Sequence, residues 1–330
     1  MVAVISMETL TEETEEELAA EQSLPSLQSP VVADDASAYE ARLTAALEEW
    51  QAVGAKEIKI DQCRPLPPLP IVHCSRILTY EEAADIIIGS VNMRDYRHRI
   101  TPTVQRKGLK KLWHKLFGHR KIDVELIEER DLMFALALVS FDTECKSHDQ
   151  MVQTIYRKLT GSSYDCPRYG GHWETIGFQG NDPATDLRGC GILGLLQLLY
   201  LATHQDNEAV ARDLYQVSLH ATQNFPFAIM GINMTKIALE SLREECLNKI
   251  CSQRRCVLPV LNDFYVGTYL IMFLSWTKHA ATIHDTGYIM QEVKKFVKSS
   301  PAEVISNLQY YRNNGVHSHF CDQHFTGLAM

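Results

Sequence analysis

Downstream of residue 190, apolar residues recur every three or four positions in one segment after another, and this spacing constrains the fold most strongly. Apolar side chains at this interval lie on one face of a helix. The alternation of apolar and polar residues that is typical of strands is not convincing in any segment. The spacing predicts helices near 190–203, 208–222, 226–249, 259–279 and 287–298, and a last one that begins at Ser300-Pro301-Ala302-Glu303. The chain is therefore expected to be all-α.

Upstream of residue 190, helical patterns alternate with segments of different composition. Two of these helices are expected to begin at capping boxes, in which two polar side chains three residues apart satisfy backbone amides at the helix start. A glycine can end the helix that precedes the central loop. The predicted helices are 36–53, 79–88 (opened by Thr79 with Glu82), 123–141, and 147–161 (opened by Ser147 with Gln150 and ended by Gly161).

Charge and cysteine content exclude several classes of protein. The formal net charge of -9 argues against a general nucleic-acid binder, which would be basic. Nine cysteines without a secretory signal are typical of reduced cytoplasmic thiols. Neither the Cys251 and Cys256 pair nor the histidine-rich tail at 317–324 has the paired spacing of a zinc site, so no metal is expected. No cofactor-binding motif is present either, and a G-x4-G-K-[ST] phosphate loop is missing.

A proline-rich segment, 64–70, cannot be helical and should extend as a polyproline II helix. Arg64, Pro67 and Pro70 match the R-x-x-P-x-x-P pattern that SH3 domains bind. A stiff linker between two helices has the same composition. Both interpretations stay open, and only the first would make an SH3-domain protein a partner.

Ten basic residues lie between Arg94 and Lys121, opposed only by Asp95. Within this stretch, apolar residues fall on one face of a helix at Leu109, Leu112, Trp113, Leu116 and Phe117. A basic amphipathic helix can lie on an anionic membrane. Packing on the chain's own domain is the interpretation we favour, so peripheral membrane contact is an alternative rather than the expectation.

The segment 161–185 is a long loop rich in glycine, proline and aspartate, and loops of this length tend to be functional. Trp173 and Phe178 supply apolar anchors for the loop. Thr185 and Asp186 are residue types that cap the start of a helix. Arg188 then carries a permanent positive charge between glycines, which suits the neutralisation of a phosphoryl group. A structural ion pair with Asp186 explains the same arginine.

The run from Trp173 to Leu198 resembles the signature of ELMO-domain proteins. It reads W-x3-G-F-Q-x3-P-x-T-D-x-R-G-x-G-x3-L-x2-L, a pattern that fixes twelve residues. The residues that supply it are Trp173, Gly177, Phe178, Gln179, Pro183, Thr185, Asp186, Arg188, Gly189, Gly191, Leu195 and Leu198. The resemblance implies a multi-helical ELMO domain at 146–305. Around it we expect an acidic, disordered N-terminus at 1–33, a helical extension at 34–145, and a helix end with a flexible tail at 306–330.

Small ELMO-domain proteins are GTPase-activating proteins for Arf-family GTPases, including the Arf-like (Arl) ones, so the resemblance implies this function. The family's catalytic arginine lies in the D-x-R-G step, and Arg188 occupies it. Gln179 could order the partner's switch region, although we favour a role within the loop. The implied protein is a regulator without a catalytic site of its own, and its partner is an Arf/Arl GTPase in the GTP-bound state.

The competing interpretation is a non-catalytic scaffold that binds a GTPase, or an adaptor in the cytoskeleton or in membrane trafficking. We expect a cytoplasmic protein, with association with the cytoskeleton or the membrane periphery as the alternative locations.

Overall fold

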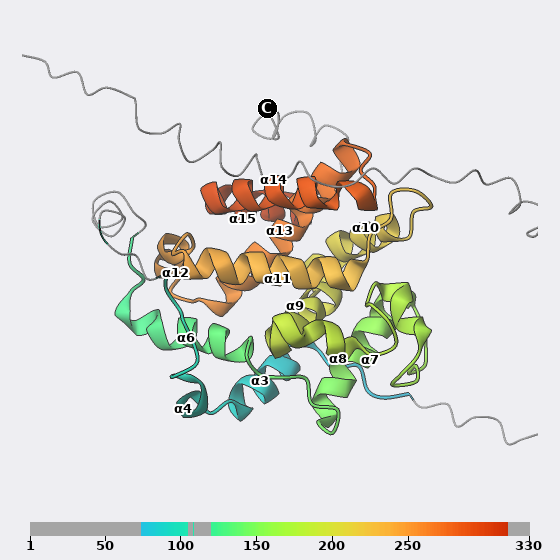
Figure 1. Ribbon diagram of the computed structural model, residues 1–330, viewed down its shortest axis with the longest axis horizontal. Helices are drawn as coiled ribbons and strands as arrows, with labels where there is room; N and C mark the ends of the chain where they lie inside the picture. Colours follow the sequence, from blue (N-terminus) through green and yellow to red (C-terminus); the bar gives the residue numbers. More distant parts are fainter. Residues whose placement is uncertain (1–73, 105–107, 109–119, 316–330) are drawn as a thin grey trace, which may run out of the picture. The chain divides into compact units, whose positions relative to one another are not determined.

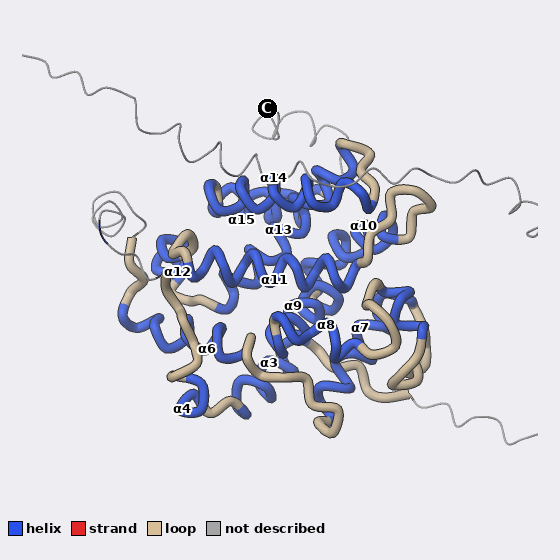
Figure 2. Tube along the Cα trace, in the orientation of Figure 1, coloured by secondary structure: helices blue, strands red, loops and turns tan. Residues whose placement is uncertain are grey.

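The computed structural model describes residues 74–104, 108 and 120–315, which belong to a compact unit spanning Pro70–Met330. Every regular element in these ranges is a helix (Figure 2), which confirms the all-α prediction. The α-helices are α3 (Tyr80–Ser90), α4 (Met93–Tyr96), α6 (Ile127–Leu136), α7 (Lys146–Thr160), α8 (Pro183–Asp186), α9 (Gly191–Thr203), α10 (Glu208–Ser218), α11 (Phe227–Arg243), α12 (Asn248–Arg254), α13 (Leu258–Lys278), α14 (Thr286–Ser299) and α15 (Pro301–Asn314). The short 3-10 helices are η1 (Val124–Leu126), η2 (Gly171–Ile176), η3 (Leu187–Gly189), η4 (Gln205–Asn207) and η5 (Ile283–Asp285).

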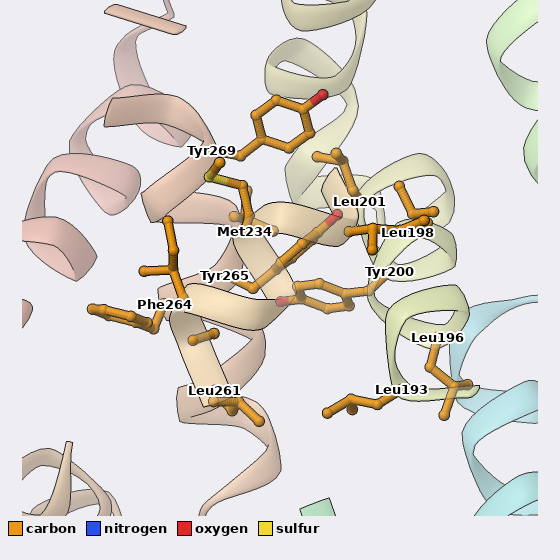
Figure 3. Packing of buried hydrophobic residues seen from close by; sticks show 14 of the residues in the cluster. Leu193, Leu196, Leu198, Tyr200, Leu201, Met234, Leu261, Phe264, Tyr265 and Tyr269 are labelled. Carbon is orange, nitrogen blue, oxygen red and sulfur yellow. The ribbon is translucent and has the colours of Figure 1, made fainter. Parts of the chain in front are cut away.

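The core forms around α13 and α9, two helices that are apolar on nearly every face. In Figure 1, α14 and α15 lie on one side of α11, and α3, α6 and α7 lie on the other. Side chains of α9 and α13 face each other in Figure 3, among them those of Tyr200 and Tyr265. Buried aromatic residues of α13 are Phe264, Tyr265, Tyr269, Phe273 and Trp276.

By length and composition α13 could cross a membrane, with a mean hydropathy of 1.2 over its most apolar window. However, 83% of that window is buried inside the protein. A helix that is hydrophobic all round and covered by other helices is typical of a core helix. Its apolar surface is therefore accounted for by packing.

A partly buried polar network joins α15 to this core. The Arg312 guanidinium donates to Asp263 on α13 at 2.9 Å and to Asn207 in η4 at 2.6 Å. The hydroxyl of Tyr200 on α9 also accepts from Arg312, at 3.3 Å. Arg254, at the end of α12, pairs with the second carboxylate oxygen of Asp263 at 2.8 Å. Charges that are paired in this way tolerate burial.

Helix starts agree only in part with the predicted caps. The Thr79 capping box is confirmed at the start of α3, with both reciprocal hydrogen bonds present. The Ser147 box is wrong, because α7 begins at Lys146 and its N-cap is Cys145. Gln150 instead donates from its side-chain amide to the carbonyl of Arg76, at 2.7 Å. Gly161 ends α7 in a left-handed conformation, as predicted.

Three helices end earlier than predicted. The helix expected at 123–141 is η1 followed by α6, which stops at Leu136 because the amides of Leu138 and Val139 both donate to the Ala135 carbonyl and turn the chain. The helix expected at 226–249 ends at Arg243, since Glu245 adopts a positive φ of 73° and the chain restarts as α12. The third, α10, ends at Ser218 rather than near residue 222.

Several predictions lie outside the described residues. They are the disordered N-terminus at 1–33, the helix at 36–53, the proline-rich segment with Arg64, Pro67 and Pro70, the apolar face at 109–117 and the histidine-rich tail at 317–324.

Candidate functional site

The loop between α7 and α9 is anchored in the core by its aromatic residues. Trp173 has no exposed surface, and its indole N–H donates to the Arg168 carbonyl at 3.0 Å. The Phe178 ring lies edge-on to the Trp173 ring with centroids 6.2 Å apart, and Phe178 is 3% exposed. Large buried aromatic side chains contribute strongly to stability. Both residues therefore lie as expected of loop anchors.

Gly177 allows the loop to lie directly against the start of α11. Its φ is +81°, and a Cβ there would lie 2.1 Å from the backbone nitrogen of Phe227. The Gly177 carbonyl accepts from the amide of Ile229 at 3.0 Å. A side chain at this position would push the loop away from α11, so glycine is required for this contact.

Aspartates fix the second half of the loop in a different way from the one predicted. The N-cap of α8 is Asp182, whose carboxylate accepts from Ala184 N at 2.9 Å, with Pro183 buried in the first turn. Asp186 is the N-cap position of η3, but its side chain makes no capping hydrogen bond there, and Thr185 lies within α8. The Thr185 hydroxyl donates to the Asp182 carbonyl at 2.8 Å, and Asp186 accepts from Gln179 N at 2.7 Å.

Arg168 ties this turn to the rest of the domain. Its guanidinium lies 2.8 Å from the Asp182 carboxylate and 3.9 Å from Asp149 on α7. It also stacks over the Phe141 ring, 4.9 Å from the centroid. These contacts hold α8, and with it η3, against α7 and the segment that follows α6.

The start of α9 is held against the end of α6 by a close backbone contact. Ile192 N donates to the Val139 carbonyl at 2.9 Å. A Cβ on Gly191 would lie 2.5 Å from that oxygen, so a larger residue would separate the two helices. The turn that carries Arg188 is therefore fixed at its start by Asp182 and at its end by Gly191.

Arg188 itself projects from this fixed turn into solvent. It is exposed, and it makes no ion pair or hydrogen bond within the described residues. The alternative structural ion pair with Asp186 is not formed, and that carboxylate accepts instead from the Gln179 amide. Burial raises the pKa of Asp186, while the hydrogen bond from Gln179 acts in the opposite direction. The turn thus presents a guanidinium whose charge is not neutralised by its neighbours.

Gly189 and Gln179 are exposed on either side of the same turn. A Cβ on Gly189 would meet only the Lys236 side chain, 3.0 Å from its Cε, which can move away. Packing within this chain therefore does not require a glycine at 189. Gln179 contacts the loop through its backbone amide, which donates to Asp186. Its side chain makes no hydrogen bond among the described residues.

Two surface hollows flank the turn. One, of about 620 Å³, lies between the loop and the α10–α11 connection and is lined by residues that include Gln179 and Leu219. The other, of about 530 Å³, is lined by Arg188, Arg99, Thr185 and the segment that follows α6. A partner that contacts Arg188 would have both surfaces within reach.

Residues 131–290 match the family model described as ELMO/CED-12 family. The sequence is 40% identical to mouse ELMO domain-containing protein 3 over 269 residues, which cover 81% of this chain and 68% of that protein. The chain belongs to the ELMO/CED-12 family.

Two further relatives are similar to this chain. Human ELMO domain-containing protein 3 is 39% identical over 81% of this chain and 68% of its own length. Mouse ELMO domain-containing protein 2 is 32% identical over 44% of each chain. No solved structure matches the sequence. Membership of the ELMO/CED-12 family indicates a GTPase-regulatory role rather than a catalytic centre that acts on its own substrate.

Four residues around the ELMO signature belong to the site but were not predicted from the sequence. Asp182 could have been found, since Asp182-Pro183 is the pattern of an N-cap followed by proline in the first turn. Lys236 and Arg99 gave no local signal because they approach the turn from distant segments, and Arg168 lies in the same loop but fourteen positions before Asp182.

No cluster of histidine, cysteine or acidic residues suited to a metal ion occurs in the described part of this ELMO/CED-12 chain. Cys166 and Cys190, which lie in the loop and beside the turn, are free thiols. Burial raises the pKa of the Cys190 thiol, beside the turn, to about 12. Such a thiol stays protonated and is a poor nucleophile.

Proposed function

We propose that this protein is a GTPase-activating protein for Arf/Arl-family small GTPases, and that Arg188 is inserted into the hydrolysis site of the GTP-bound partner. The observation that carries the proposal is an exposed arginine, without an ionic partner among the described residues, on a turn that is otherwise held from several sides. An arginine used only for structure would be expected to pair with the adjacent carboxylate.

Placing a guanidinium against a reacting phosphate costs free energy unless its position is already fixed. A guanidinium is always protonated, and its planar fork matches the oxygens of a transferring phosphoryl group. Donors that are already positioned need no reorganisation when charge develops in the transition state. Asp182, Asp186 and Gly191 hold the backbone of the turn, so Arg188 would extend toward a partner from a fixed position on the chain.

Gly189 supports close approach by a partner. The residue is exposed, and neither a positive φ nor a rigid neighbour accounts for a glycine there. The absence of a side chain beside Arg188 lets another backbone come near. Lys236 lies next to Gly189 and adds a second positive charge to this surface.

Single-turnover GTP hydrolysis by a panel of purified Arf-family GTPases, with and without this protein, tests the proposal. We expect stimulation of at least one member. Arg188→Lys should lower the stimulated rate on the order of 10³-fold, because a lysine keeps the charge but not the bidentate fork. Arg255→Lys, at an exposed arginine after α12, is the matched control and should retain full activity.

Two results would contradict the proposal. An Arg188→Lys protein with full activity would make the guanidinium dispensable, and one that loses its thermal transition would make it structural. Binding of a GTP-loaded GTPase without stimulated hydrolysis would favour the non-catalytic scaffold instead.

A further inference from the structure

The 530 Å³ hollow beside the turn is lined by two arginines from separate parts of the chain. Arg188 comes from the ELMO signature, whereas Arg99 follows α4 and precedes the matched family region, 131–290. The segment that follows α6, residues 137–141, lines the hollow together with them. The extension upstream of the ELMO match therefore contributes to the surface around Arg188.

The charge of this hollow is positive. Asp182 is the only carboxylate among the lining residues, and its charge is already used by the Arg168 guanidinium and the Ala184 amide. Neither Arg99 nor Arg188 pairs with a carboxylate within the described ranges. Arg97, two positions before Arg99, does form such a pair, with Glu128 at 3.1 Å.

The backbone beside Arg99 is held in place. Ile100 packs against the core, and the Thr101 carbonyl accepts from Arg243 Nε on α11 at 2.9 Å. Arg243 in turn stacks over the Phe134 ring of α6, 5.1 Å from the centroid. The Arg99 guanidinium lies 5.7 Å from the Tyr96 ring centroid, a contact that leaves its hydrogen-bond donors free.

Two positive charges that share a hollow repel each other, and an anion bound between them offsets this repulsion. We propose that Arg99 binds a carboxylate on the surface of the GTP-bound GTPase whose nucleotide Arg188 reaches. This inference rests on the proposed function. Arg188 supplies charge to the reacting phosphate, and Arg99 contributes to affinity and orientation, since a charge at the rim of an interface acts chiefly on association.

The test uses two measurements on the full chain. One is the Kd for each panel GTPase loaded with a non-hydrolysable GTP analogue, and the other is the maximal single-turnover hydrolysis rate at saturating protein. Arg99→Ala should weaken binding about fivefold to tenfold, less so at high salt, with the maximal rate within about twofold of wild type. Arg188→Lys should show the reverse pattern.

Arg94→Ala is the matched control. Arg94 is exposed, lies on α4 five positions before Arg99, forms no ion pair among the described residues and does not line the hollow. Its substitution removes the same charge and should leave binding within about twofold of wild type. Thermal midpoints of all variants should match that of the wild type.

Equal binding by Arg99→Ala and wild type would overturn the inference, and so would equal weakening by Arg94→Ala, which would indicate general charge attraction. A large loss of maximal rate with unchanged binding would assign Arg99 to the nucleotide phosphate and reject the carboxylate contact. Because the analogue is not hydrolysed, a wild-type protein that binds but does not stimulate hydrolysis would reject the proposed activity alone. A wild type that binds no panel member overturns both.

Discussion

At the scale of single residues, two glycines of the loop show the difference between backbone strain and steric overlap. Gly177 and Gly180 have nearly the same left-handed backbone, with φ of +81° and +73°. A Cβ on Gly180 would meet no atom within 4 Å, whereas one on Gly177 would overlap the backbone at the start of α11. The loop thus depends on Gly177 for its contact with α11.

Gly177→Ala should therefore be far more damaging than Gly180→Ala. A left-handed alanine costs roughly 1–2 kcal/mol, which is the full expected effect at Gly180. Overlap with backbone atoms cannot be relieved by a side-chain movement, so Gly177→Ala should cost more than about 4 kcal/mol of unfolding free energy. Urea denaturation of both variants measures the difference, and equal losses would show that the contact with α11 can relax.

At the scale of elements, α8 is a single turn that depends on its cap. Four residues cannot form a stable helix on their own, because nucleation is unfavourable. Asp182 provides the cap oxygen and also the carboxylate that Arg168 contacts. Stability of this turn and the position of Arg188 are therefore coupled through one side chain.

Two substitutions at Asp182 separate its roles. Asp182→Asn retains an oxygen that can cap Ala184 N and removes only the charge, whereas Asp182→Ala removes both. We expect the alanine variant to lose about 1 kcal/mol more stability than the asparagine variant, together with a larger loss of stimulated hydrolysis. Thermal unfolding and single-turnover rates measure these effects. Indistinguishable variants would mean that the Arg168 contact, rather than the cap, holds the turn.

At the scale of the whole molecule, the region that matches the family model is smaller than the folded unit. Residues 131–290 exclude α3 and α15, although both contribute to the common core. The buried side chains of α15 include Val304, Ile305, Leu308 and Tyr311. On the other side, the amide of Asn262 on α13 donates to the Tyr80 hydroxyl of α3.

A fragment limited to 131–290 should consequently fail to fold cooperatively. Loss of four buried side chains from α15 alone, at about 2 kcal/mol each, removes as much free energy as a typical domain has in total. A fragment that spans 74–315 should give one cooperative transition near that of the full chain. Circular dichroism melts and binding of a hydrophobic dye compare the two, and a sharp transition for 131–290 would contradict this view of the core.

The helical class and the approximate helix positions could be predicted from the sequence alone. So could the capping box at Thr79. These features depend on residues within about one or two helical turns of each other, so local spacing and local hydrogen bonding suffice to predict them. The family resemblance, carried by twelve residues within one short run, was likewise readable from sequence.

Contacts between groups that are separated along the chain could not be predicted from the sequence. Asp186 could have paired with Arg188, but the folded loop brings the Gln179 amide to that carboxylate and leaves the arginine exposed. The Val139 carbonyl, which follows α6, accepts from an amide of α9, and Arg99 shares a hollow with Arg188 although nothing in its own segment indicates this. Contacts between distant segments arise when the core packs, and no local pattern of residues records them.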